Sequence, residues 1–405
     1  MKPKLRFPEF THVWFEATLQ DEYDYKNAKA HEPFVVQNGK YKLINSKFIS
    51  TEGKIFKTVD KVLTKGSVGD VTMVLSDLPN GKALAKAFYI EEDDTYAINQ
   101  RICRLRVLDE QRNDSKFFYY LINRNCYFLR LDDGISQTHI SKGDVLNFRY
   151  YTTHLNEQAR IKDLLTCVDH KINLLAKKRE ALEAHKKGLM QKIFSQELRF
   201  KREDGADYPE WEYVHLGKIG SFSTSSVDKK TLPNEPIVHL VNYVDVYHHR
   251  DINNNTVSQM MTVSAKPTQL KSSNLKKGDI LFTPSSETPD DIGHSVVIEE
   301  DIINGVYSYH LMRFRPIIEI DIPYSHFFCN HEDVLKQIIR FATGSTRFTV
   351  SVGNFEKVVV PLPSIQEQRK IAAVLKSVEG LIDELEKQLN STLLLKKGLL
   401  QQMFV

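Results

Sequence analysis

Two stretches of the sequence decide the fold: residues 134–158, GISQTHISKGDVLNFRYYTTHLNEQ, and residues 344–368, GSTRFTVSVGNFEKVVVPLPSIQEQ. They align without a gap at an offset of 210 residues, and the same offset relates KKGLMQKIF at 186–194 to KKGLLQQMF at 396–404. A constant offset over stretches this long indicates two copies of one unit, each a globular part followed by a long helix. Such a chain has internal pseudo-twofold symmetry, which suits a target that also comes in two halves.

Each copy continues into a helical pattern whose seam positions alternate in steps of four and three, the a/d spacing of a heptad repeat. The seams comprise Ile161, Leu165, Val168, Ile172, Leu175, Arg179, Leu182, Lys186, Leu189 and Ile193, and then Ile371, Leu375, Val378, Ile382, Leu385, Leu389, Thr392, Lys396, Leu399 and Met403. A lone helix of this length, about 60 Å, would leave its seam in water. We therefore expect the two helices to pack as an antiparallel coiled coil; an ordinary core helix in one domain is the alternative.

Cations interrupt both seams, at Arg179, Lys186 and Lys396. A cation at such a position usually extends its charge to solvent or sets the register of the helices, and docking a partner is a less common use.

The regions before each long helix are rich in short β-like runs separated by turns that contain Gly, Asn, Asp and Pro. We predict an α+β fold with two mixed α/β domains at 1–154 and 208–362, helices at 155–194 and 363–405, and a linker at 195–207. A shorter helix is expected at Ser115–Tyr127, with a counterpart at Glu332–Phe341.

Composition narrows the class of protein. The 405 residues are 41% hydrophobic and 26% charged, which is ordinary for a globular protein of two or three domains. The sequence contains no apolar run long enough for a membrane span and no apolar secretory segment, so we expect a cytoplasmic protein. The scattered Cys103, Cys126, Cys167 and Cys329 argue against a zinc site and a disulfide framework. The net charge of +3 neither requires nor excludes nucleic acid.

Motifs for catalysis are not found. The sequence lacks a Walker A loop, G-x-G-x-x-G, G-x-S-x-G, H-E-x-x-H and the Asn-Pro-Pro or Asp-Pro-Pro tetrapeptides of amino-methyltransferases. Asp290 and Asp291 are neighbours in a loop, where carboxylates more often form turns than acid–base pairs. The scattered histidines do not predict a metal site, so no catalytic or metal residue is assigned.

Polar loops remain, at 78–86 and 134–140 in the first copy and at 221–226, 283–291 and 344–350 in the second. Their Ser, Thr, Gln, Arg and His side chains are of the kinds that contact base edges and phosphates, although solvated turns have the same composition. Arg347 occupies the position that aligns with Gln137. Arg commonly pairs with guanine and Gln with adenine, so the two copies would read different bases if both place this residue in a groove of the DNA.

The whole chain resembles the specificity subunit of type I restriction–modification systems. The resemblance rests on LNEQARI (155–161) and IQEQRKI (365–371), which open the long helices, and on the KKGLMQKIF and KKGLLQQMF endings. LRFPEF (5–10) and KKGDILFT (276–283) belong to it as well. The second copy keeps the usual proline pattern, VVVPLPSIQEQ, whereas the first has RYYTTHLNEQ without either proline.

The resemblance implies a non-catalytic DNA-binding subunit that directs DNA methylation and phage defence. Each globular part would be a target-recognition domain that reads one half of a bipartite, asymmetric site, and the paired helices would fix the spacer between halves. Two methyltransferase subunits carrying S-adenosylmethionine would dock on the helices, and endonuclease–translocase subunits that use ATP and Mg would join them. This chain would bind none of these cofactors.

Candidate residues follow from the loops and the helix openings. For double-stranded DNA they are Lys82, Lys86, Gln137, Thr138 and His139 in the first domain, and Ser285, Ser286, Thr288, Arg313, Arg347 and Thr349 in the second; Arg313 is equally suited to a structural role in a strand. Candidates for partner docking, on outward helix positions, are Gln158, Arg160, Gln368 and Arg369, which alternatively pair within the chain.

Other classes of protein fit the same pattern. A two-headed DNA-binding regulator would bind duplex without partners, and a coiled-coil adaptor would show no salt-dependent affinity for DNA. A nuclease would cut with magnesium alone.

Overall fold

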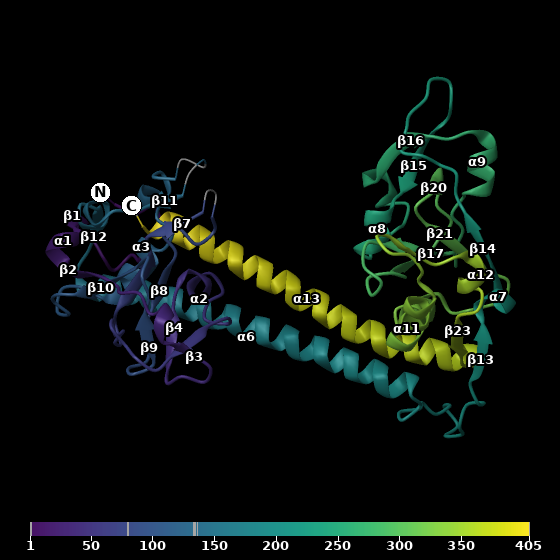
Figure 1. Ribbon diagram of the computed structural model, residues 1–405, viewed down its shortest axis with the longest axis horizontal. Coiled ribbons are helices and arrows are strands. Elements are labelled where there is room, and N and C mark those ends of the chain that lie inside the picture. Colours follow the sequence, from purple (N-terminus) through teal and green to yellow (C-terminus); the bar gives the residue numbers. More distant parts are fainter. Residues whose placement is uncertain (1, 79–80, 133–134, 136, 405) are drawn as a thin grey trace. The chain divides into compact units, whose positions relative to one another are not determined.

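The computed structural model describes residues 2–78, 81–132, 135 and 137–404 (Figure 1). Gly134, which opens the first repeat, lies outside the described residues, as do positions 1 and 405, the ends of the predicted domains. The chain forms two compact units. Unit 1 comprises Met1–Lys177 and Glu386–Val405, and unit 2 comprises Lys178–Leu385. Each unit therefore contains one globular part and one segment of each long helix, and the domain bounds drawn from the sequence stay predictions.

Unit 1 contains short strands and short helices before the first long helix (Figure 1). The strands are β1 (Phe15–Thr18), β2 (Tyr23–Asn27), β3 (Val35–Val36), β4 (Tyr41–Ile44), β5 (Lys57–Val59), β6 (Val71–Val74), β7 (Ser76–Asp77), β8 (Ala87–Tyr89), β9 (Tyr96–Ile98), β10 (Ile102–Val107), β11 (Thr138–His139) and β12 (Arg149–Thr152). The helices are α1 (Leu19–Glu22), the 3-10 turn Glu32–Phe34, α2 (Ser46–Ser50), α3 (Ser115–Ile122), α4 (Cys126–Leu129) and α5 (Lys142–Leu146).

Unit 2 has the corresponding elements in the same order. Its strands are β13 (Glu212–His215), β14 (Gly220–Thr224), β15 (Ile237–Val241), β16 (Met261–Ser264), β17 (Ile280–Phe282), β18 (Ser285–Ser286), β19 (Ser295–Val297), β20 (Gly305–Tyr307), β21 (Met312–Pro316), β22 (Phe348–Thr349) and β23 (Val359–Leu362). Its helices are α7 (Leu216–Ile219), α8 (Tyr243–Tyr247), the 3-10 turn Val257–Gln259, α9 (Pro267–Ser272), α10 (Ile322–Cys329), α11 (Glu332–Phe341) and α12 (Val352–Phe355).

The sheets of the two units match one another. The main sheet has the strand order β2-β10-β6-β8 in unit 1 and β14-β21-β17-β19 in unit 2. A smaller sheet has the order β3-β5-β4-β9 in unit 1 and β16-β15-β20 in unit 2, and each contains one parallel pair, β4 with β9 and β15 with β20. Two-stranded ribbons complete the match: β1-β12 and β11-β7 correspond to β13-β23 and β18-β22. The duplication read from the sequence therefore extends to the topology.

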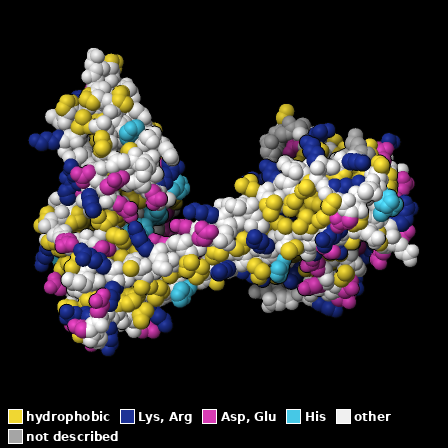
Figure 2. Space-filling model, turned by 180° about the vertical axis from the view of Figure 1, so that it is seen from behind, with side chains coloured by type: hydrophobic (Ala, Val, Ile, Leu, Met, Phe, Trp, Pro, Cys, Tyr) yellow, Lys and Arg dark blue, Asp and Glu magenta, His cyan; other side chains and the backbone are white. Residues whose placement is uncertain are grey.

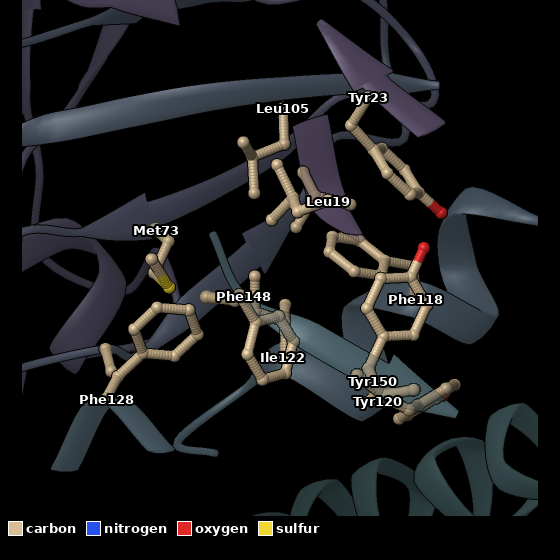
Figure 3. Close-up of a cluster of buried hydrophobic side chains, with 14 of the residues drawn as sticks. Leu19, Tyr23, Met73, Leu105, Phe118, Tyr120, Ile122, Phe128, Phe148 and Tyr150 are labelled. Atoms are coloured by element: carbon tan, nitrogen blue, oxygen red, sulfur yellow. The ribbon is translucent and has the colours of Figure 1, made fainter. Parts of the chain in front are cut away.

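Aromatic side chains fill the core of unit 1 between the main sheet and α3 (Figure 3). Phe118 of α3 stacks on Tyr23, with ring centroids 4.0 Å apart, and Phe128 and Phe148 lie 4.9 Å apart. All four side chains are buried. Burying each such ring stabilises the folded state by about 1.5–3 kcal/mol, so this cluster holds the sheet against the helix.

The long helices are α6 (Leu155–Phe194) and α13 (Ile365–Met403). In unit 1, Ile161 and Leu165 near the start of α6 share a core with Met403 at the end of α13. In unit 2, Ile193 near the end of α6 shares a core with Ile371 near the start of α13. The segments in each unit thus run antiparallel, as the heptad seams predict. Among the described residues, no helix is long and apolar enough to cross a membrane.

The seam lysines make equivalent ion pairs in the two units. Lys186 lies 2.5 Å from Glu379 Oε1 in unit 2, and Lys396 lies 2.5 Å from Asp169 Oδ1 in unit 1. Lys396 also lies over the ring of Tyr120 on α3, 5.7 Å from its centroid, and Lys186 is 5.9 Å from the centroid of Phe327 on α10. Each lysine therefore connects both long helices to the globular part of its unit.

The short helices differ from the prediction. The helix expected at Ser115–Tyr127 ends at Ile122, because Arg124 adopts a left-handed conformation (φ 57°), and α4 then begins at Cys126. A helix does occupy Glu332–Phe341, but the counterpart of α3 is α10. Asp114 and Asp321 are the N-caps of α3 and α10, and each backbone N–H donates to the equivalent glutamine of a long helix, Gln158 or Gln368.

Candidate nucleic-acid interface

Equivalent two-stranded ribbons bring most of the candidate DNA-binding residues together. In unit 1, β7 pairs with β11 so that Ser76 lies opposite His139. In unit 2, β18 pairs with β22 so that Ser285 lies opposite Thr349. The alternation of side chains along a strand places these residues at matching positions of two matching ribbons.

Gln137 and Arg347 make the same contact at these ribbons. The Gln137 Nε2 donates to Ser76 Oγ at 2.9 Å, and Arg347 Nη2 donates to Ser285 Oγ at 3.1 Å. Gln137 and Arg347 are both exposed, so each retains donors that face solvent. Two different polar side chains therefore occupy equivalent positions in the two units, and each contacts the equivalent serine of its own ribbon.

Unit 2 has a pocket of about 480 Å³ beside its ribbon. It is lined by Lys229, Tyr243, Val244, Tyr247, Ser285, Ser286, Glu287, Thr288, Asp291, His310 and Arg347. An adjoining pocket of about 400 Å³ is lined by Ser285, His310, Arg347 and Thr349, among others. The candidates Ser285, Ser286, Thr288, Arg347 and Thr349 therefore converge on one surface, although the two serines are largely buried there.

The pocket has a cationic and an acidic side. Burial lowers the pKa of His310, and the nearby Lys229 and Arg347 lower it further, whereas Asp228 opposes this shift. On the acidic side, Asp291 accepts a hydrogen bond from Tyr247 at 3.0 Å and lies 2.8 Å from His294 Nε2. A surface with donors and a cationic side is suited to base edges and phosphate oxygens.

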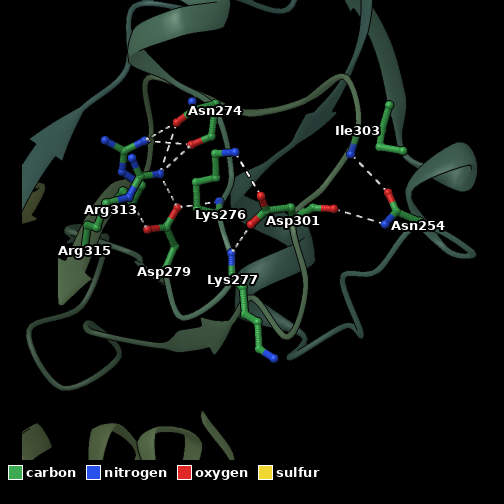
Figure 4. Close-up of polar contacts among 9 residues, drawn as sticks. All are labelled: Asn254, Asn274, Lys276, Lys277, Asp279, Asp301, Ile303, Arg313 and Arg315. Carbon is green, nitrogen blue, oxygen red and sulfur yellow. Dashed lines mark hydrogen bonds and ion pairs between the residues drawn. The ribbon is translucent and has the colours of Figure 1, made fainter. Parts of the chain in front are cut away.

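Arg313 is on β21, an inner strand of the main sheet of unit 2, and its side chain lies beside Asn274 (Figure 4). It is only 8% exposed, and its Nη1 donates to the Asn274 carbonyl oxygen at 2.6 Å. Its neighbour Arg315 forms a bidentate pair with the fully buried Asp279, at 2.6 and 2.7 Å. The sequence analysis left open a structural role for Arg313 in a strand, and its burial and its contact with Asn274 agree with that role. Arg313 is not exposed to contact DNA.

In unit 1 the candidates have different surroundings. Lys82 and His139 are exposed, whereas Thr138 is buried and donates to Asp132 Oδ1 at 3.0 Å. Lys86 is half-buried, and its ammonium lies 3.2 Å from the Ser50 carbonyl oxygen and 3.4 Å from Glu52 Oε1. Part of the charge of Lys86 is therefore neutralised within unit 1, and Lys82, Gln137 and His139 are the accessible candidates.

The expectation that Gln158 and Gln368 point outward is wrong. They are 1% and 2% exposed. The Nε2 of Gln158 donates to the Thr153 carbonyl oxygen at 2.7 Å, and that of Gln368 donates to the Pro363 carbonyl oxygen at 2.8 Å. These contacts match although one copy has threonine where the other has proline. Both glutamines join the start of a long helix to the globular part.

The glutamate before each of these glutamines is held by an arginine. Arg6 donates to both oxygens of Glu157, at 2.7 and 2.8 Å. Arg199 contacts both oxygens of Glu367, at 3.3 and 3.1 Å. Burial by itself raises the pKa of the Glu157 carboxyl, but hydrogen bonds from Arg6 and its other donors outweigh burial and hold this pKa below its usual value.

We call these two arginine–glutamate pairs the arginine clamps. The sequence analysis did not predict them, nor did it predict the pocket residues Lys229, Tyr243 and His310. A signal for the clamps was present, because LRF recurs at 5–7 and 198–200 and EQ recurs in both helix openings. The pocket residues come from segments that the internal alignment does not cover. By contrast, Arg160 and Arg369 are exposed at the surface, as expected for a docking position.

Comparison with known proteins places these features in one family. The family model described as "Type I restriction modification DNA specificity domain" matches residues 26–184 and 208–395. These ranges make up most of the chain and lie in both copies. The chain belongs to the type I restriction modification DNA specificity family. It is therefore the DNA specificity subunit of a type I restriction–modification complex, and a non-catalytic subunit. The predictions of family, fold class and function are confirmed.

Individual relatives agree with this assignment. The chain is similar to the MjaVIII specificity subunit of Methanocaldococcus jannaschii, with 26% identity over 293 residues, 69% of this chain and 67% of that protein. It is similar to the EcoBI specificity subunit of Escherichia coli, with 23% identity over 318 residues, 73% and 65% of the two chains. The S subunit of M. genitalium has the same fold, with a TM-score of 0.63, 19% identity and coverage of 100% and 99%.

Proposed function

We propose that this subunit reads a bipartite DNA site with its two ribbons, one half-site for each unit. The observation that carries the proposal is the repeated hydrogen bond to a ribbon serine, made by Gln137 in unit 1 and by Arg347 in unit 2. Gln137 and Arg347 occupy equivalent positions but offer different hydrogen-bond donors and acceptors. The two units would therefore approach DNA with the same geometry and prefer different bases. In this proposal Arg347 contacts guanine and Gln137 contacts adenine.

The remaining accessible candidates would support these readers. Thr288 and Thr349 are exposed around Arg347, and Lys82 and His139 are exposed in unit 1. Hydroxyl and cationic groups at the edge of a reading surface commonly bind phosphate oxygens and fix the register of the protein on the duplex.

The long helices would set the spacer and dock two methyltransferase subunits, which carry S-adenosylmethionine; endonuclease–translocase subunits with ATP and Mg would complete the assembly. Support for docking comes from leucines on these helices that are more than half exposed: Leu174, Leu394 and Leu395 in unit 1 and Leu381 in unit 2. Hydrophobic side chains are visible along the helices in Figure 2. Exposed apolar side chains on a helix suit a protein partner.

The test is co-expression with the methyltransferase subunit, followed by methylation-sensitive sequencing of host DNA. We expect methyladenine in both halves of one bipartite motif, and loss of this motif when the subunit is deleted. Gln137→Arg should then change the base preference in one half only, while Arg347→Gln should change it in the other half. A methylome that does not depend on this subunit, despite a stable complex, would contradict the proposal.

A further inference from the structure

Two residues of unit 1 have a backbone conformation that side chains disfavour, and they are hydrogen-bonded to one another. Ala85, in the loop between β7 and β8, has φ 54°, and Arg124, two residues after α3, has φ 57°. The backbone N–H of Arg124 donates to the Ala85 carbonyl oxygen at 2.8 Å. A left-handed conformation is unfavourable for residues other than glycine and persists only where surrounding contacts impose it. The β7–β8 loop is therefore held in a shape that it would not adopt alone.

The side chain of Arg124 holds the same loop. Its Nη1 donates to the Lys82 carbonyl oxygen at 3.0 Å and to the Leu84 carbonyl oxygen at 3.4 Å. A guanidinium group carries several N–H donors in a fixed planar arrangement, so one arginine can keep several carbonyl groups in place at once. Arg124 therefore fixes the path of the chain from Lys82 to Ala85.

Asp77, at the end of β7, holds the loop from its other side. One carboxylate oxygen accepts from the backbone N–H of Leu78 at 2.9 Å, and the other accepts from that of Ala83 at 2.8 Å. Asp77 also lies opposite Thr138 in the ribbon of unit 1. The loop is thus tied to the ribbon beside Gln137.

Lys82 is the exposed residue of this held segment. Ala83, Leu84 and Ala85, which follow it, are buried. The backbone N–H of Ala85 donates to the Val74 carbonyl oxygen of β6 at 3.0 Å. Because the residues after Lys82 are anchored, the direction in which the lysine leaves the surface depends on how the loop is held.

The corresponding loop of unit 2 has a glycine at this turn. Gly293 has φ 87°, and its N–H donates to the Thr283 carbonyl oxygen at 3.0 Å, as that of Ala85 does to Val74. Glycine adopts this conformation readily, whereas alanine does not. Strained residues of this kind cluster at functional sites, where the surrounding structure fixes a geometry that the function requires. The strain at Ala85 therefore points to a functional need for a fixed loop in unit 1.

We propose that Arg124 is a positioning residue for base reading by unit 1. It fixes the β7–β8 loop so that Lys82 donates to a base edge next to the one that Gln137 contacts; lysine pairs with the O6 and N7 of guanine in the major groove. This inference rests on the proposed function, and it assigns to Lys82 a base contact in place of a phosphate contact. A flexible lysine can follow a phosphate as a point charge without a fixed loop, but reading a base requires a defined position.

The experiment measures the affinity of the complex with the methyltransferase subunit for a duplex that contains its methylation motif, and for duplexes with one changed base pair in either half. The half that unit 1 reads is the one whose preference changes in Gln137→Arg. The test variants are Arg124→Lys and Arg124→Met. The matched control is Arg112→Met, which removes an arginine of unit 1 with 63% side-chain exposure and a 3.5 Å contact to Glu22.

A wrong base pair typically weakens specific binding roughly 5- to 150-fold. In both Arg124 variants we expect this penalty to fall below about twofold at one base pair of the unit 1 half-site, and to keep the parent value throughout the other half. Arg124→Lys should fail as Arg124→Met does, because one ammonium group cannot hold the carbonyl oxygens of Lys82 and Leu84 together. The control should behave as the parent.

A second variant tests whether Arg124 acts through Lys82. Lys82→Gln should lose the penalty at the same base pair, and adding Arg124→Met to it should cause no further loss, because both substitutions remove one contact. A further loss in the double variant, at another base pair or on every duplex, would show that Arg124 does not act through Lys82 and would overturn the inference.

Two other outcomes would overturn the inference and leave the proposed function in place. One is the parent penalty at every base pair in both Arg124 variants. The other is an equal weakening on every duplex, which would make Arg124 a phosphate contact or a support of the fold; urea unfolding of Arg124→Lys, followed by Trp14 fluorescence in a Trp211→Phe background, separates these two. A parent complex that does not prefer its motif over other duplexes would overturn the proposed function and the inference with it.

Discussion

Removing Arg6 should destabilise unit 1 far more than removing an exposed arginine. Glu157 is 1% exposed, and it accepts two hydrogen bonds from Arg6 and one each from Trp14 and Thr153. In Arg6→Met the carboxylate would keep only neutral donors in a buried site, at a cost of about 3–5 kcal/mol. This is a large part of the roughly 5–15 kcal/mol that stabilises a typical domain.

The control is Arg160→Met, in which an arginine with 60% side-chain exposure loses a contact to Glu9 at 4.0 Å. Such a surface pair contributes about 0–1 kcal/mol. Urea unfolding can be followed by Trp14 fluorescence in a Trp211→Phe background, since the chain has two tryptophans and Trp14 lies beside the clamp in unit 1.

The difference between parent and Arg6→Met should also depend on pH. In the parent the folded-state pKa of Glu157 lies below its usual value, so the carboxylate stabilises the fold above the unfolded pKa, about 4.3, and this stabilisation is lost as the pH falls through the folded pKa. Without Arg6, burial raises this pKa and protonation relieves the penalty. We therefore expect the difference in unfolding free energy to shrink from pH 7 towards pH 4. A loss equal to that of Arg160→Met, or one constant with pH, would refute the reasoning.

Three further predictions concern DNA recognition and the helices. Arg347→Ala should weaken binding to the cognate motif by about 1–3 kcal/mol and relax one half-site in a binding-selection assay; an equal loss on every sequence would make Arg347 a phosphate contact. Lys186→Glu should lower the melting temperature of unit 2 in a thermal scan, and adding Glu379→Lys should restore it. A double variant that melts no higher than Lys186→Glu would show that the two residues are not coupled. Inserting one heptad into both long helices adds about 10 Å and should lengthen the methylated motif's spacer by about three base pairs, with both half-sites unchanged. An unchanged spacer would show that the helices do not set it.

Exposed side chains were harder to predict from the sequence than the architecture was. Gln137 and Arg347 could be paired from the internal alignment, because a duplicated chain places aligned residues at equivalent positions. Their supporting serines, Ser76 and Ser285, could not, since the ribbons join strands far apart in the sequence. Gln158 and Gln368 were assigned to the wrong side of their helices, because an amphipathic pattern does not show what packs beside the first turn of a helix.

The sequence by itself determined the duplication, the two long helices and their mutual packing. These follow from local periodicity and a constant offset, and a heptad seam has few stable solutions in water. Only the tertiary structure decided which polar groups are buried and which face solvent. It showed Arg313 inside a sheet, Glu157 and Glu367 in arginine clamps, and Lys229, Tyr243 and His310 around the Arg347 pocket. The physical reason is that the burial of a polar group depends on partners brought from distant segments, and local pattern carries no record of those partners.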